Sequence, residues 1–259
     1  MKAMQKIVIK VGTSTLTQGS QKLSLRFMLG LVQQIADLKS QGLEIILVSS
    51  GAVAAGKDLL NSDKAEQSQP SKQTLASIGQ VKLMQVWSEL FAIFDLQVGQ
   101  VLLTKDDFSN YKRQFTRETL CCLLQHHIIP IINENDTVAA KDLCVGNNDN
   151  LAALVANLLA ADAVILLTDQ EGLYTADPRL NPDAELISVV KQIDEKICRL
   201  AGGSSTSLGT GGMATKIAAA QMVSESGART IIASSTRPNI LLDLAEGKQI
   251  GTLITHEVL

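Results

Sequence analysis

Short apolar segments that suit buried β-strands alternate along the chain with longer segments that show the spacing of amphipathic helices. The expected strands are residues 6–11, 44–49, 98–103, 128–133, 163–168, 230–233 and 251–254. Strands this apolar are typical of parallel sheets with both faces covered, because the covering helices leave few strand residues in contact with water. The alternation therefore predicts an α/β fold, a three-layer α/β/α sandwich around a mainly parallel sheet.

Helical periodicity and helix-end signals locate the segments between the strands. Ser24 is a suitable N-cap for the first long helix, and Gly42 is expected to end it. Further helices are expected at residues 52–60, 71–94, 116–127, 148–159, 212–226 and 239–246. Residues 171–212 are expected to be rich in loops, because Asp-Pro and Asn-Pro pairs mark turns there. No repeat or linker-like stretch interrupts the pattern, so a single domain over residues 1–259 is expected.

Composition narrows the possible partners. Aromatic residues make up only 3% of the chain, the net charge is −3, and no run of lysine and arginine occurs, so we expect no nucleic-acid partner. The most apolar window, residues 151–167, contains Asn157 and Asp162, so we expect no membrane span. No C-x-x-C pair occurs among the cysteines, which suggests reduced thiols in a cytoplasmic protein. These cysteines are Cys121, Cys122, Cys144 and Cys198.

Two glycine-containing segments, residues 10–13 and 209–216, each carry one lysine where a strand or loop leads into a helix. Backbone N–H groups beside Lys10 or Lys216 suit an anion with several oxygens, such as a nucleotide phosphate. The second segment is not a P-loop, because Thr215 precedes its lysine, and no G-x-G-x-x-G follows the first strand. A glycine-rich loop can also be a plain connection. If the fold joins the two segments, both lysines can flank one phosphate chain.

Small polar residues follow four of the expected strands at their carboxyl ends. They are Gly12-Thr13-Ser14, Ser49-Ser50-Gly51, Asn133-Glu134-Asn135-Asp136 and Thr168-Asp169. Any one of these could be an ordinary helix cap or turn. Open α/β sheets bind ligands at this edge, so the four endings together favour a binding site.

The polar segment 147–150 begins an expected helix and has two interpretations. In the simpler one, Asn148 or Asp149 is the N-cap. In the functional one, the carboxylate of Asp149 lies among lysines and phosphates and orients the lysines. Asp136 is likewise either a turn residue or the counter-ion of a substrate ammonium group.

Other catalytic and metal-binding patterns are weak. No H-x-x-x-H or Cys/His cluster predicts a zinc site, and Ser50 lacks the G-x-S-x-G setting of a serine hydrolase. Asp106-Asp107 and the carboxylates of Glu134 and Asp136 could hold a metal, but solvated or capping roles are favoured. We therefore predict no metal ligands on the protein.

The ordered motifs of the chain resemble the amino acid kinase family, and within it the glutamate 5-kinase branch, from about residue 6 to residue 254. The matching blocks are residues 8–14 (VIKVGTS), 48–56 (VSSGAVAAG), 71–73 (SKQ), 99–104 (GQVLLT), 132–137 (INENDT), 146–150 (GNNDN), 167–178 (LTDQEGLYTADP) and 209–216 (GTGGMATK). The resemblance implies the amino acid kinase fold and ATP-dependent phosphorylation of the side-chain carboxylate of L-glutamate, the first step of proline biosynthesis. It also implies Mg²⁺ with the ATP, feedback inhibition by proline, and a homodimer or homotetramer.

The resemblance also implies roles for particular residues. The catalytic residues would be Lys10, Lys216 and Asp149, with Asp149 holding the two lysines. The ATP site would be formed by Lys10, Gly12, Thr168, Asp169, Gly211, Gly212, Met213 and Lys216. Glutamate would be held by Ser50, Gly51, Asp136 and Asn148, with Asp136 beside its ammonium group. The acceptor carboxylate is already ionised at neutral pH, so no general base is required.

Two departures from the family pattern stand out. Asn147 lies where the family often has aspartate, which removes a negative charge near the substrate. Many bacterial members carry a C-terminal PUA domain of about a hundred residues, and this sequence ends at Leu259, so we expect none. Two alternatives stay open: a kinase of the same fold with another acceptor, and a non-catalytic nucleotide or amino-acid sensor.

Overall fold

The computed structural model describes residues 4–60, 70–138, 145–202, 212–224 and 227–255. Within these ranges the strands are β1 (Lys6–Val11), β2 (Glu44–Ser49), β3 (Val98–Leu103), β4 (Ile129–Glu134), β5 (Ala163–Thr168), β6 (Val189–Val190), β7 (Arg229–Ser234) and β8 (Thr252–Ile254). They form one eight-stranded sheet in the order β3-β4-β2-β1-β5-β7-β8-β6. The strands from β3 to β7 in this order pair in parallel, whereas β8 pairs antiparallel with β7 and parallel with β6. The predicted, mainly parallel sheet is confirmed.

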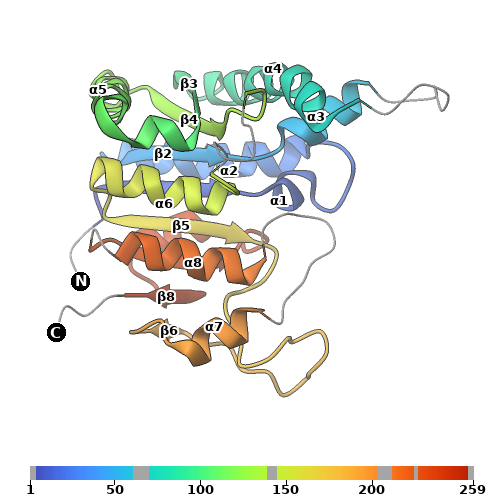
Figure 1. Cartoon of the computed structure of the whole chain (residues 1–259), viewed down its shortest axis with the longest axis vertical. Coiled ribbons are helices and arrows are strands. Elements are labelled where there is room, and N and C mark those ends of the chain that lie inside the picture. Colours follow the sequence, from blue (N-terminus) through green and yellow to red (C-terminus); the bar gives the residue numbers. More distant parts are fainter. Residues whose placement is uncertain (1–3, 61–69, 139–144, 203–211, 225–226, 256–259) are drawn as a thin grey trace.

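Helices cover both faces of the sheet, as Figure 1 shows. They are α1 (Thr13–Thr17), α2 (Leu25–Ser40), α3 (Ala52–Leu59), α4 (Lys72–Ala92), α5 (Asn110–Gln125), α6 (Asn148–Leu159), α7 (Glu195–Gly202), α8 (Met213–Ser224) and α9 (Ile240–Ala245), with a short 3₁₀ helix, η1, at Lys105–Phe108. Alternate residues of each strand point to opposite faces, so β1 directs Val8 to one face and Ile7 and Ile9 to the other. Val8 packs in the core beneath α5, α6 and α8, and Ile7 and Ile9 in the core beneath α2, α4 and α9. The three-layer arrangement predicted from the alternation is confirmed.

The structure differs from the sequence prediction mainly in short or exposed elements. Helix α5 begins at Asn110, ahead of the expected start at residue 116, and its first turns expose Tyr111 and Phe115. Exposed turns carry no apolar stripe, which is the signal that periodicity detects. Strand β6 and helix α7 lie in the segment expected to be loop-rich, and α1 begins at Thr13, where a helix was expected after the strand but its length was not predicted. Two- to eight-residue elements are too short to show a period.

The strand order places a topological switch beside β1. From β1 the chain passes to β2 on one side, and after β4 it returns to β5 on the other side of β1. The register pairs Val11 with Leu167, so the carboxyl ends of β1 and β5 lie next to each other. Ligands of open α/β sheets bind at such a point, because the connections on either side of it diverge.

Helices α3 and α4 approach each other at backbone distance. A Cβ atom on Gly79 would lie 1.8 Å from the carbonyl oxygen of Ala52, and one on Gly56 would lie 2.0 Å from that of Leu75. Only glycine fits at these two crossings. The first turn of α3, which follows Gly51, is therefore held directly against α4.

None of the helices in the described part of the chain combines the length and apolarity needed to cross a membrane.

Candidate active site

A buried carboxylate joins the two lysines that the sequence singled out. Asp149 of α6 places Oδ1 2.7 Å from Nζ of Lys10 on β1, and Oδ2 3.4 Å from Nζ of Lys216 on α8. The three residues are 1%, 6% and 5% exposed, respectively. Two cations around one anion leave a net positive charge at the switch point of the sheet. Such a site favours a ligand with several negative oxygens.

The start of α6 positions Asp149. The N-cap is Asn147, whose Oδ1 accepts a hydrogen bond from the backbone N–H of Asn150 at 2.9 Å. The expectation that Asn148 or Asp149 caps this helix is therefore wrong. With Asn147 as the cap, Asp149 falls in the first turn, where the helix dipole favours a negative charge. Asparagine and aspartate cap helices about equally well, so asparagine at position 147 preserves this local geometry.

Thr215 also contacts the carboxylate of Asp149, a contact that the sequence had not predicted. Its Oγ1 lies 2.7 Å from Oδ2 of Asp149 and 2.8 Å from the carbonyl oxygen of Gly212. A hydroxyl has one proton, so it donates to one of these acceptors at a time. The sequence feature that could have pointed to this contact is the position of Thr215 directly before Lys216, in the first turn of a helix that follows glycines.

The charges in this cluster perturb one another. Burial by itself raises the pKa of Asp149, but the charges of Lys10 and Lys216, with hydrogen bonds from Lys10 and Thr215, outweigh it and lower the pKa to about 2. Asp149 is therefore ionised at neutral pH. Burial lowers the pKa of Lys10 below 10.5, Asp149 opposes that shift, and Lys216 adds to it. Lys10 thus loses its proton more readily than a lysine in water.

The residues predicted to bind ATP lie around the ends of β1, β5 and the start of α8. A Cβ atom on Gly12 would lie 3.4 Å from Nζ of Lys10, so the backbone passes close to that ammonium group. Thr168, at the end of β5, donates from Oγ1 to Oδ1 of Asp169 at 3.0 Å. Gly212 and Met213 lie where α8 begins. Gly211 lies outside the described residues.

A chain of side-chain hydrogen bonds extends from the lysine cluster toward α4. Asn148, next to Asp149, donates from Nδ2 to Oγ of Ser50 and to Oδ1 of Asn133, each at 2.8 Å. Asn133 in turn donates from Nδ2 to Oε1 of Gln80 at 2.9 Å. We call Ser50, Asn148, Asn133 and Gln80 the amide relay. It brings together Ser50 and Asn148, which were predicted to bind the acceptor, with two further residues. Asn133 was predicted only to lie at the ligand-binding edge of the sheet, and Gln80 was not singled out.

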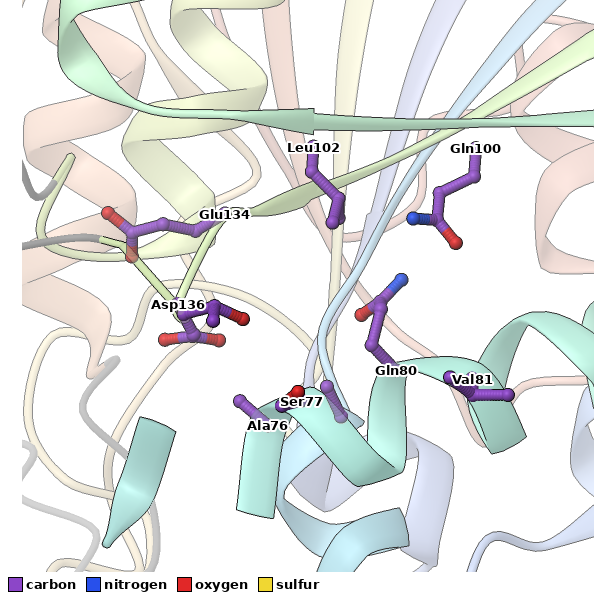
Figure 2. Close-up of a pocket in the computed structure, with 10 residues that line it drawn as sticks. Ala76, Ser77, Gln80, Val81, Gln100, Leu102, Glu134 and Asp136 are labelled. Carbon is purple, nitrogen blue, oxygen red and sulfur yellow. The ribbon is translucent and has the colours of Figure 1, made fainter. Parts of the chain in front are cut away.

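A cavity of about 210 Å³ adjoins the amide relay. Its lining residues come from α3, α4, β3, the end of β4 and the turn that follows β4, and are Ala52, Ala76, Ser77, Gln80, Val81, Gln100, Leu102, Glu134, Asp136 and Thr137. Figure 2 shows Glu134 and Asp136 on one side of this cavity and Gln80 and Gln100 on the other. The cavity is smaller than the roughly 300–1,000 Å³ typical of sites for drug-sized ligands, and so suits a small metabolite.

Asp136, the predicted counter-ion for a substrate ammonium, already contacts a cation in the structure. Its Oδ1 lies 3.1 Å from Nζ of Lys72, at the start of α4. Lys72 is largely exposed, whereas Asp136 is mostly covered. Gly51 is the remaining residue predicted to bind the substrate that accepts the phosphoryl group. It has a φ of 109° and lies directly before the backbone N–H groups at the start of α3. This left-handed conformation explains glycine at that position.

The other polar clusters have local partners. Asp106 accepts from Ser109 and pairs with Lys112, and Asp107 accepts from Thr104 ahead of η1, in agreement with the capping interpretation. Within the described ranges, no group of three or more His, Cys, Asp or Glu side chains has the arrangement of a metal site. Cys121, Cys122 and Cys198 carry free thiols, and Cys144 lies outside these ranges.

Comparison with known proteins agrees with this architecture. The model of the amino acid kinase family matches residues 5–234. Glutamate 5-kinase of Haemophilus influenzae (strain ATCC 51907 / DSM 11121 / KW20 / Rd) is 53% identical over 253 residues, which are 97% of this chain and 69% of that protein. Glutamate 5-kinase of Pasteurella multocida (strain Pm70) is 52% identical over the same shares of the two chains.

Solved structures of more distant proteins share the fold. UMP kinase from Bacillus anthracis aligns with a TM-score of 0.68 at 14% identity and covers 99% of this chain and 98% of its own. UMP kinase from Ureaplasma parvum aligns with a TM-score of 0.65 at 17% identity, over 97% of this chain and 99% of its own. At these identities the likeness concerns the fold. The family match and the relatives named glutamate 5-kinase show that the chain belongs to the amino acid kinase family, in its glutamate 5-kinase branch.

Proposed function

We propose that this protein transfers the γ-phosphoryl group of ATP to the side-chain carboxylate of L-glutamate, forming L-glutamyl 5-phosphate and ADP, the first step of proline biosynthesis. The observation that carries the proposal is the Lys10–Asp149–Lys216 cluster, which is continuous with the amide relay through Asn148. A phosphate site at the two lysines would therefore adjoin an acceptor site at the amide relay. The choice of L-glutamate as the acceptor rests on the relatives named glutamate 5-kinase.

The phosphate chain of ATP would lie at the carboxyl ends of β1 and β5. Lys10 and Lys216 neutralise its charge, and Asp149 and Thr215 keep Lys216 in place. Gly12 and Gly212 let phosphate oxygens approach the backbone N–H groups. Phosphoryl transfer depends chiefly on alignment and on this kind of charge stabilisation.

The acceptor would lie between the lysine cluster and the cavity. Ser50, Gly51 and Asn148 direct its side-chain carboxylate toward the phosphate, and Asp136 faces its ammonium group. A carboxylate oxygen forms the new bond to the γ-phosphorus, and the bond from that phosphorus to the β–γ bridging oxygen breaks, leaving ADP. The carboxylate is already ionised, so no residue has to remove a proton.

Mg²⁺ would enter with ATP. Both carboxylate oxygens of Asp149 face lysines, and the described side chains form no carboxylate cage. Mg²⁺ commonly keeps several waters and is held by substrate phosphates with one or two carboxylates, so these residues fit a phosphate-held ion. Such an ion supplies further charge neutralisation.

The test is ADP formation from ATP and Mg²⁺ with L-glutamate, with N-acetylglutamate and aspartate as parallel acceptors and hydroxylamine to trap the acyl phosphate. Glutamate-dependent ADP with a trapped hydroxamate supports the proposal. ADP with a different acceptor would identify another kinase of this fold. ATP binding without turnover on any acceptor would favour a sensor.

Lysine variants sharpen this test. Lys10→Ala and Lys216→Ala should each reduce turnover about a hundredfold or more, by analogy with the loss of one transition-state donor. Lys248→Ala is the matched control, because Lys248 pairs with Asp243 on the exposed surface. Near-normal turnover of Lys10→Ala would contradict the catalytic role.

We further propose feedback inhibition, self-association and a cellular location for this protein. Inhibition by proline would involve the acceptor site between Asp136 and Asn148. The protein would form a homodimer or homotetramer and would be located in the cytoplasm.

A further inference from the structure

We infer that Gln80 recognises the amino acid acceptor: its amide nitrogen binds the α-carboxylate, while its amide oxygen accepts the hydrogen bond from Asn133 and so holds the amide relay in place. This inference rests on the proposed function, and extends it to a residue on α4. Gln80 is both a member of the relay and part of the cavity lining.

The hydrogen bonds determine which way each amide of the relay points. The backbone N–H of Glu134 can only donate, and it contacts Oδ1 of Asn133 at 2.9 Å. The other end of the Asn133 amide is therefore its nitrogen, which donates to Gln80. Gln80 must present its oxygen there, so its Nε2 group points away from Asn133. Figure 2 shows this nitrogen on the side of Gln100.

The charge pattern of the cavity suits the head group of a free α-amino acid. Its lining contains two carboxylates, Glu134 and Asp136, and none of the described lining residues is lysine or arginine. Oε1 of Glu134 accepts from the backbone N–H of Val145, and Oδ1 of Asp136 faces Lys72. Oδ2 of Asp136 can therefore receive an ammonium group, while the α-carboxylate needs a neutral donor on the opposite side.

Gln80 meets that need from a rigid position. The adjacent Gly79 packs against the carbonyl oxygen of Ala52, so α4 is in close backbone contact with the first turn of α3. Two turns further along α4, Trp87 donates from Nε1 to Oγ of Ser49 at 3.0 Å, directly beside Ser50. Helix α4 thus fixes both the relay and the strand end that faces the acceptor.

The decisive variant is Gln80→Glu. It keeps an oxygen for Asn133 and replaces the donor nitrogen by a second, negatively charged oxygen. Gln85→Glu is the matched control, since Gln85 lies on the exposed side of the same helix and contacts Glu89. The acceptors compared are L-glutamate and L-isoglutamine, in which a carboxamide replaces the α-carboxylate.

In Gln80→Glu, the KM for L-glutamate should rise about tenfold to a hundredfold, as expected for losing a hydrogen bond to a charged group, with the KM for ATP unchanged. The carboxamide of L-isoglutamine can donate to the new carboxylate. The ratio of kcat/KM for L-glutamate to that for L-isoglutamine should therefore fall in this variant and stay constant in Gln85→Glu. Where L-isoglutamine turns over too slowly, its inhibition constant against L-glutamate replaces kcat/KM.

Equal losses of kcat/KM for L-glutamate and L-isoglutamine would overturn the inference, because a purely structural role of Gln80 does not distinguish the two compounds. Gln80→Met, similar in length and without a donor, is the second variant should Gln80→Glu not fold. It should raise the KM for L-glutamate and reduce discrimination between the two compounds, and unchanged discrimination would also overturn the inference. Absence of glutamate phosphorylation by the unmodified protein would instead contradict the proposed function.

Discussion

Nζ of Lys10 lies 2.7 Å from Oδ1 of Asp149, and both side chains are almost completely buried. Lys10 belongs to the central strand β1 and Asp149 to the first turn of α6, so this contact ties the middle of the sheet to the start of a covering helix. Because Lys216 approaches the other oxygen of Asp149, one carboxylate controls the position of both cations.

Replacing Asp149 by asparagine should damage both stability and turnover. The change leaves Lys10 and Lys216 as buried like charges without a counter-ion, and breaking a buried ion pair typically costs about 3–5 kcal/mol. We expect a loss of that order in the free energy of unfolding, measured with urea, and at least a hundredfold loss of turnover.

Asp243→Asn is the control for Asp149→Asn. Asp243 pairs with Lys248 at the surface, where solvent screens the interaction. The Asp243→Asn variant should have the same free energy of unfolding and the same turnover as the unmodified protein. Equal behaviour of the two variants would contradict the central role of Asp149.

Activity should decrease at high pH because of Lys10. Only the protonated lysine neutralises phosphate charge, and burial lowers its pKa, so raising the pH removes this proton before a lysine in water would lose its own. The profile of kcat/KM for ATP should therefore show a basic limb below pH 10.5, the ordinary value for lysine. Bound phosphates favour the charged form, so the limb in kcat should lie at higher pH.

Lys10→Arg tests the origin of that limb. Arginine stays protonated up to higher pH than lysine, so the basic limb should move to higher pH even if the rate is lower. Lys248→Arg should leave the profile unchanged. A limb that persists in Lys10→Arg would assign it to another group.

Replacing Gly12 by alanine should impair catalysis while preserving the fold. Gly12 has φ −85° and ψ 165°, which alanine readily adopts, but the new methyl group would lie 3.4 Å from Nζ of Lys10. That space is where a phosphate oxygen would approach the lysine. We expect about a tenfold or larger fall in kcat/KM for ATP, with a free energy of unfolding within about 1 kcal/mol of the original.

Gly30→Ala provides the comparison, because a Cβ atom at Gly30 of α2 would have no neighbour within 4 Å. It should stabilise the protein by about 0.5–1 kcal/mol, as alanine does in helices, without affecting the kinetics. If Gly12→Ala also left the kinetics unaffected, the phosphates would have to lie elsewhere.

Asp136→Asn should chiefly weaken acceptor binding. The change keeps the shape of the side chain and removes the charge that would face the ammonium group. The KM for L-glutamate should rise about tenfold or more, as expected for losing a hydrogen bond between charged groups. The KM for ATP should stay constant in the same initial-rate experiments.

Asp58→Asn controls for the loss of a carboxylate that pairs with a lysine, because Asp58 lies 3.1 Å from Lys22. It should leave both KM values unchanged. An Asp136→Asn protein with a higher KM for ATP alone would show that the ammonium assignment is wrong.

Much of the fold could be predicted from local patterns. The buried strand Ala163–Thr168 is apolar up to its last residue, and long helices such as Leu25–Ser40 have a capping serine and an apolar stripe. The prediction was incomplete where those signals are absent, at the exposed start of α5 and in the short elements α1, β6 and α7. Local sequence cannot reveal a helix turn that buries no side chain.

The sequence by itself determined the alternation of strands and helices and the residue types at the strand ends, because both follow from short-range periodicity and backbone chemistry. Only the tertiary structure decided which of those residues meet. Gln80 and Asn133 are 53 positions apart, and their hydrogen bond depends on the order of the strands and on a helix crossing that permits only glycine. The same holds for Lys10, Asp149 and Lys216, whose contacts require β1, α6 and α8 to converge at one edge of the sheet.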